Sequence, residues 1–116
     1  MAKRSARERI KDIAESIDKV ERFLMGKTFD DFRTDALVHD AVVRNLEIVS
    51  EASRHVPADV KSRAPHILWR ETADFGNVLR HGYEGVNDGI IWDTIKRDLP
   101  VLRAVVQGFL DDPAIG

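Results

Sequence analysis

The residues with the greatest potential for chemistry lie in one stretch of the sequence, positions 69–86. At about 100° per residue, a helix over this stretch places four polar residues on one stripe: Arg70, Asp74, Asn77 and His81. A second stripe points elsewhere and is mostly apolar, consisting of Leu68, Thr72, Phe75 and Leu79. The predicted helix therefore has one side for the core and one side for chemistry.

The end of this helix carries the most reactive side chain. Gly82 and Gly85 are expected to end the helix, because glycine frees the backbone to turn. His81 and Tyr83 then lie at a helix terminus, where an imidazole that titrates near neutral pH is useful. Residue types alone leave two interpretations open for His81, a reactive group or a group that only interacts with the helix dipole. Tyr83 has a structural alternative too, as an amphipathic plug at the helix end.

Apolar residues before this stretch recur at three- and four-residue intervals, the spacing of amphipathic helices. A first helix is predicted from about residue 5 to residue 25, before Gly26, and its inward residues are Ile10, Ile13, Ile17, Val20 and Leu24. Thr28 and Asp31 are expected to cap a short turn. A second long helix runs from about residue 35 to 55, with an inward face of Val38, Val42, Leu46, Val49 and Ala52 or Ser53. Pro57 and Pro65 bound a connector that holds a single turn.

Two more helices are expected after the chemical stretch. Asn87 is placed to cap a fourth helix that carries Ile91 and Ile95. Asp98 with Pro100 predicts the start of a fifth helix, which Asp112-Pro113 ends. No strand-like alternation and no internal repeat competes with these helices. The expected fold is therefore all-α, an up-and-down helical bundle of about four to five helices, in a single domain over residues 1–116.

Composition and charge restrict the classes of function. The 116 residues are 43% apolar and 33% charged, enough for one core in a domain small enough to gain from oligomerisation. With 18 basic and 20 acidic side chains the net charge is -2, so any RNA contact must come from a local patch. The basic residues near the N-terminus predict a solvated helix face or, alternatively, a contact to RNA or a partner: Lys3, Arg4, Arg7, Arg9 and Lys11.

Cysteine and histidine usage argues against disulfide and metal chemistry. The chain has no cysteine, which is compatible with a reducing cytosol. Its four histidines are widely separated and lack ligand spacing, so neither a metal site nor a cofactor is expected. No segment approaches the roughly 20 apolar residues that span a bilayer. We therefore expect a cytoplasmic protein without a membrane segment.

Several short segments together are characteristic of a known family. Within positions 69–86 they are Trp69-Arg70-Glu71, Asn77, Leu79, His81-Gly82-Tyr83 and Gly85-Val86, and further matches lie within 41–52 and 91–100. These residues resemble the signature of the HepT-like proteins of the HEPN superfamily, whose motif is an arginine, four to six residues, a histidine, any residue and a tyrosine. The motif arginine would fall at Gly76, Phe75 or Asp74, and none of these is arginine.

The resemblance implies a HEPN-like bundle that is the toxin of a toxin–antitoxin pair, a homodimeric endoribonuclease that cuts RNA without metal. His81 would then act as general acid or base on the ribose 2′-hydroxyl and the leaving oxygen, and Tyr83 would contact the phosphate. The implied partner is a minimal nucleotidyltransferase antitoxin, which silences the toxin by attaching AMP to Tyr83. The alternative is a catalytically disabled dimerisation or binding module that partners a nucleotidyltransferase.

The missing motif arginine makes Arg80 a candidate, because positions 76 and 80 are one helical turn apart on the same stripe. Arg80 either replaces the motif cation or is a solvated or salt-bridging residue. Asn77 is expected to support the site. Arg44 and Glu47 lie among apolar residues of the second long helix, where they form a structural ion pair or shape the site. Gly76 itself either permits close approach of another helix or is a defect.

Overall fold

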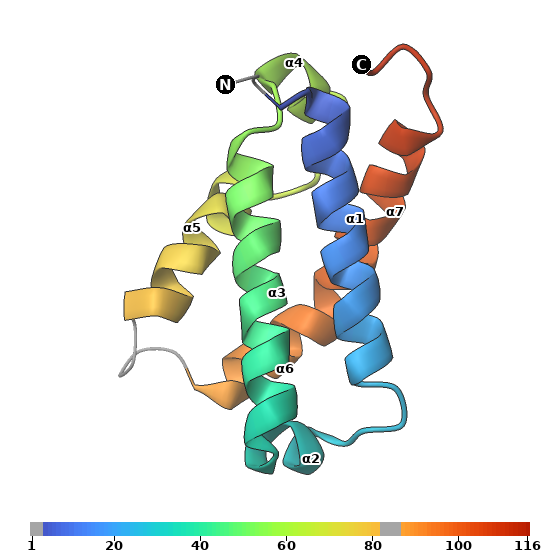
Figure 1. The fold of residues 1–116 in the computed structure, drawn as a ribbon. Helices are drawn as coiled ribbons and strands as arrows, with labels where there is room; N and C mark the ends of the chain where they lie inside the picture. The colour runs from blue at the N-terminus through green and yellow to red at the C-terminus, as the bar shows by residue number, and fades with distance from the viewer. Residues whose placement is uncertain (1–3, 82–86) are drawn as a thin grey trace.

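The computed structural model describes residues 4–81 and 87–116, with only the backbone of His81, and these residues form helices without any strand. Seven helices follow one another in the described residues (Figure 1): α1 (Ala6–Phe23), α2 (Phe29–Thr34), α3 (Ala36–Arg54), α4 (Ala58–Lys61), α5 (Trp69–His81), α6 (Asp88–Arg97) and α7 (Leu99–Leu110). Since α2 and α4 have only six and four residues, the five longer helices correspond to the predicted ones. The expected all-α bundle is confirmed.

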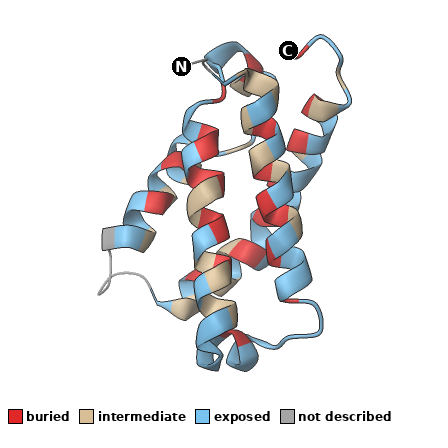
Figure 2. Ribbon diagram, viewed as in Figure 1, coloured by how far each residue is buried: buried red, intermediate tan, exposed pale blue. Residues whose placement is uncertain are grey.

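Helix α3 is the central element of the bundle. It packs against α1 on one side and α5 on the other, whereas α7 packs against α1 (Figure 1). Buried residues recur along α1 and α3 with exposed residues between them (Figure 2), as amphipathic helices require. The inward face predicted for α1 is correct at all five positions: Ile10, Ile13, Ile17, Val20 and Leu24. Because α5 rests on α3, the geometry of the chemical stretch is determined by α3.

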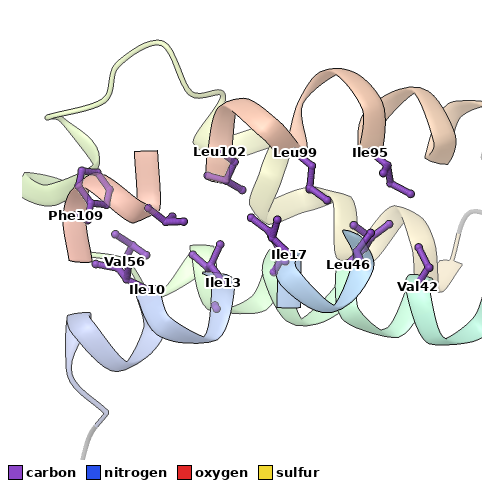
Figure 3. Packing of buried hydrophobic residues seen from close by; sticks show 14 of the residues in the cluster. Ile10, Ile13, Ile17, Val42, Leu46, Val56, Ile95, Leu99, Leu102 and Phe109 are labelled. Atoms are coloured by element: carbon purple, nitrogen blue, oxygen red, sulfur yellow. The ribbon is translucent and has the colours of Figure 1, made fainter. Parts of the chain in front are cut away.

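The core lies where α1, α3, α6 and α7 meet (Figure 3). Ile10, Ile13 and Ile17 of α1 are completely buried. They belong to the same cluster as residues of the other three helices, among them Val42, Leu46, Ile95, Leu99, Leu102 and Phe109. Each fully buried side chain of this size contributes about 1.5–3 kcal/mol of hydrophobic stabilisation. The apolar spacing in the sequence therefore produces the packed core that includes α3, the helix against which α5 lies.

Helix caps predicted from the sequence are present. Thr28 and Asp31 form a complete capping box, with the Thr28 Oγ1 accepting from the Asp31 amide at 3.1 Å. The Asn87 side chain accepts from the Ile90 amide at 3.0 Å and so begins α6. At the start of α7 the side chain of Asp98 makes no capping bond, although Pro100 lies in the first turn as expected.

One arginine of the N-terminal basic group holds the two ends of the described chain together. The guanidinium of Arg7 donates to the backbone carbonyls of Leu110, Asp112 and Ile115 at 2.8–3.1 Å. A cation at the C-terminal end of α7 also interacts favourably with the helix dipole. The prediction of a single solvated basic face is therefore wrong at Arg7, which has a structural role.

His39 joins α3 to the beginning of α6. Its Nε2 lies 2.7 Å from the Asp88 Oδ1 and its Nδ1 lies 3.3 Å from the Asp40 Oδ1, while the ring stacks on Phe32. Burial lowers the pKa of His39, but the hydrogen bonds to Asp88 and Asp40 outweigh it, so the pKa is raised above 6.5. No helix in the described ranges combines the length and apolarity needed to cross a membrane.

Candidate functional site

Gly76 lies at a close contact between α5 and α3. Its amide donates to the Ser50 Oγ at 2.8 Å, and the same hydroxyl donates to the Ala73 carbonyl at 2.7 Å. A Cβ at position 76 would lie only 2.7 Å from the Ser50 Oγ and 3.0 Å from the Ser50 Cβ. Of the two interpretations offered by the sequence, close helix approach is the one that the structure shows, because the missing side chain makes room for Ser50.

The contact at Gly76 is reinforced from one turn further along α3. The Nη2 of Arg54 also donates to the Ala73 carbonyl, at 2.7 Å, so this oxygen accepts from two side chains of α3. A carbonyl oxygen has two lone pairs and can accept both bonds. Helix α5 is thus attached to α3 by polar bonds as well as by apolar packing, which fixes its rotation about its own axis.

Arg80 turns back along α5 toward position 76. Its Nη2 donates to the Asn77 Oδ1 at 2.6 Å, and its Nη1 lies 3.7 Å from the Glu47 Oε2 on α3. The same Nη1 would lie 3.4 Å from a Cβ at position 76. The structure therefore brings together three of the residues singled out in the sequence, and it places the guanidinium beside the position that lacks the motif arginine.

Glu47 and Arg80 border a cleft of about 430 Å³ between α1, α3 and α5. Its lining is mostly charged, and we call it the arginine cleft, formed by Arg4, Arg9, Asp12, Arg44, Glu47, Ile48, Glu51, Ala52 and Arg80. The volume falls within the range of about 300–1,000 Å³ that small-ligand sites occupy. Arg44 and Glu47 both line this cleft, and Glu47 lies 3.7 Å from the Arg80 Nη1 on α5.

The carboxylates of the arginine cleft are engaged by neighbouring cations. Asp12 lies 2.5 Å from the Arg4 Nη1. Glu51 accepts from the His55 Nε2 at 3.0 Å, and this hydrogen bond holds the pKa of Glu51 below its ordinary value of 4.5. Glu47 faces Arg80, and its side chain is only 20% exposed. Each of these three carboxylates therefore already has a cationic neighbour.

Two arginines of the cleft differ from the others. Within residues 4–81 and 87–116, Arg9 and Arg44 form no ion pair. Arg9 is half-buried and Arg44 is exposed. The expectation that Arg44 is paired is therefore wrong in the described part of the chain. The cleft carries uncompensated positive charge on an otherwise acidic protein.

His81 is the last residue of α5 and follows Arg80 directly. Its side chain lies outside the described residues, and so does the whole of Tyr83. Their roles remain predictions. On the polar stripe of α5, Arg70, Asp74 and Asn77 are exposed, as the periodicity predicts.

Sequence reasoning missed Ser50, Arg54 and Glu51, and it placed Arg9 only within a general basic group. A signal for the cleft was present on α3, because Arg44, Ile48 and Glu51 are spaced at i, i+4 and i+7 and so share one stripe. Ser50 and Arg54 form a second such pair. No described group of three His, Asp or Glu side chains has the arrangement of a metal site.

A second cavity, of about 410 Å³, contains none of the predicted site residues. It lies between α3, α5, the segment before α5 and the junction of α6 with α7, and its lining is mainly apolar. Leu68 and Val101 lie at this cavity and are exposed. Of these two cavities, the arginine cleft is the one lined by predicted site residues, namely Arg44, Glu47 and Arg80.

Comparisons with known proteins identify the family of the chain. The family model described as "Ribonuclease HepT-like" matches residues 13–108. A Thermococcus cleftensis protein named "Probable ribonuclease HepT" is 43% identical over 101 residues, which cover 87% of this chain and 92% of that protein. A Methanocaldococcus jannaschii protein named "Putative RNase" is 32% identical over 92% of this chain and 98% of its own length.

A further Methanocaldococcus jannaschii relative is longer than this chain. It is named "Gamma-glutamylcyclotransferase and putative RNase", and it is 35% identical over 86% of this chain but only 45% of its own length. No solved structure matches the chain significantly.

Proposed function

Because the chain belongs to the HepT-like ribonuclease family, we propose that it is a metal-independent endoribonuclease and the toxin of a toxin–antitoxin pair. The observation that carries this proposal is the position of Arg80. Its guanidinium lies beside position 76, where the family motif has its arginine, and Asn77 and Glu47 hold it there. A cation therefore lies beside the position of the motif arginine although residue 76 is glycine.

In the proposed reaction, His81 removes the proton from the ribose 2′-hydroxyl, and the 2′-oxygen attacks the adjacent phosphorus. The bond to the 5′-oxygen breaks, a proton from a general acid completes the leaving hydroxyl, and a 2′,3′-cyclic phosphate remains. An imidazole suits these transfers because it titrates near neutral pH. Arg80 stabilises the charge that develops on the phosphate oxygens, and its forked donors suit this role. Tyr83 holds the phosphate through its hydroxyl.

The proposed working unit is a homodimer in which two copies of the motif face one cleft. A twofold axis supplies a second His81, so that one imidazole serves as base and the other as acid. A small domain also gains stability by burying more apolar surface in a dimer. Ultracentrifugation at micromolar concentration is expected to show the dimer, and a monomer under these conditions would contradict this arrangement.

The proposed partner is a minimal nucleotidyltransferase that attaches AMP to Tyr83. An adenylate adds bulk and negative charge where the RNA phosphate docks, so it inhibits through sterics and repulsion. The location proposed for this system is the cytoplasm, where the RNA and the nucleotide donor are present.

The proposal is tested by cleavage of single-stranded RNA in the presence of a chelator. The wild-type protein is expected to cut, and His81→Ala is expected to lose about 10²–10⁴-fold in rate, the usual contribution of general acid–base catalysis. His66→Ala is a matched control, because His66 is exposed in the segment before α5. Cleavage that persists in His81→Ala, or that disappears with the chelator, would refute the mechanism.

One observation favours a second candidate function, a binding module without catalysis. Gly76 is buried against Ser50, so position 76 of this chain serves the packing of α5 on α3. In that case the wild-type protein does not cut RNA under any condition but binds the nucleotidyltransferase. The same cleavage assay, together with a pull-down of the purified partner, distinguishes the two functions.

A further inference from the structure

The charges of the arginine cleft favour the binding of an anion. Arg9 on α1 and Arg44 on α3 both line it, and neither forms an ion pair in the part of the chain that the structure describes. An anion that enters the cleft would therefore meet two guanidinium groups without a carboxylate partner among the described residues, and charge-assisted hydrogen bonds to such groups are strong. This makes the cleft a candidate binding site in its own right.

The remaining charges of the cleft do not satisfy these two arginines. Asp12 is engaged by Arg4, Glu51 by His55 and Arg54, and Glu47 faces Arg80. Each of these carboxylates therefore has its own cation. The two unpaired arginines lie on adjacent helices that pack together, so their charges act on the same space.

We propose that the arginine cleft binds the backbone phosphates of single-stranded RNA and leads the strand to His81. This inference rests on the proposed ribonuclease function. It assigns the surface that binds the phosphates of the substrate on which no bond is cut. Arg9 and Arg44 bind consecutive phosphates. Arg80 lies at the α5 border of the same cleft and contacts the phosphate that reacts. Arginine suits this role because its fork of donors matches phosphate oxygens.

The lining of the cleft also determines how RNA is read. Among the described residues, the lining includes no aromatic side chain on which a base could stack. Contacts to phosphate carry no sequence information. The cleft therefore contributes affinity and direction of the strand, and any preference for particular bases must arise elsewhere. A protein with a net charge of -2 needs such a local patch, because its overall field repels RNA.

The test measures binding of a fluorescent single-stranded RNA whose 2′-hydroxyls are methylated, so that binding is separated from cleavage. Anisotropy titrations at several salt concentrations compare the wild type with Arg9→Gln, Arg44→Gln and the double variant. Each substitution is expected to raise Kd about three- to tenfold. Each lost phosphate contact also reduces the steepness of log K against log salt by about 0.7, and the double variant by about 1.4.

Arg22→Gln is the matched control, because Arg22 lies on α1, is exposed and does not line the cleft. It removes the same charge and is expected to leave Kd and the salt slope near their wild-type values. Arg9→Lys and Arg44→Lys keep the charge and are expected to retain the slope while losing part of the affinity. Circular dichroism verifies that all variants keep their helical content.

Three results would overturn the inference. If the wild type binds and cuts RNA but the cleft variants have the same Kd as the wild type, the cleft does not bind the RNA strand, although the ribonuclease function stands. If Arg22→Gln loses as much affinity as Arg9→Gln, the effect is one of net charge. If the cleft variants dissociate the dimer in ultracentrifugation while retaining RNA affinity, the cleft faces a second copy of the chain.

Discussion

Replacing Gly76 with alanine is expected to destabilise the protein, although the same change in most helices stabilises it. Alanine is favoured over glycine by about 1 kcal/mol in a helix interior. Here the added Cβ would lie 2.7 Å from the Ser50 Oγ, and Ser50 is itself almost completely buried. Overpacking of this kind costs about 1–3 kcal/mol. Displacing the hydroxyl also weakens two bonds, each worth about 0.5–1.5 kcal/mol.

Together these terms predict a net loss of about 1–3 kcal/mol in the free energy of unfolding of Gly76→Ala. Urea denaturation followed by circular dichroism measures it, and the melting temperature should fall by about 4 °C for each kcal/mol. Gly108→Ala is the matched control. Gly108 lies on α7 with open space around its missing Cβ, so alanine there should stabilise by up to about 1 kcal/mol.

A double-mutant cycle with Ser50→Ala tests the cause. Ser50→Ala alone removes the hydroxyl that bonds to Gly76 and Ala73, and it is expected to cost about 1–3 kcal/mol. In the double variant the oxygen is absent, so the added methyl group no longer meets it and the combined loss should be smaller than the sum. Stabilisation by Gly76→Ala equal to that by Gly108→Ala would refute the tight contact.

Three further predictions concern charge and modification. Arg80→Ala should lower kcat/KM for RNA cleavage by about 10²–10³-fold, and Arg70→Ala, an exposed cation of the same helix, should change it little; equal losses would contradict a specific role. His39→Gln should be less stable than the wild type mainly at acid pH. The pKa of folded His39 is raised, so the stabilisation that His39 provides is complete below about pH 6.5 and is lost as pH rises through the folded pKa. Urea midpoints of both proteins at about pH 5.5 and 8.5 measure this difference. Tyr83→Phe should abolish labelling by AMP in the presence of the nucleotidyltransferase without changing helical content, and a labelled variant would exclude Tyr83 as the acceptor.

The sequence alone determined most of the helical framework, because amphipathic periodicity and capping are local. Ile10, Ile13 and Ile17 reveal the inward side of α1 through their spacing, and Asn87 marks the start of α6 through its own side chain. Motif recognition works in the same way, since His81 and Tyr83 are two residues apart and carry the family pattern without any knowledge of packing. Their geometry remains a prediction.

Only the tertiary structure decided what the polar residues of different helices do to one another. In the sequence, Gly76 only marks the absence of the motif arginine. The structure shows its role, which is to leave room for Ser50 of α3. Arg9 and Arg44 are far apart in the chain, and they face one cleft because α1 packs on α3 in a particular register. The helical period assigns a residue to a face of its own helix, whereas the partner that it meets depends on how the ridges and grooves of two helices interlock.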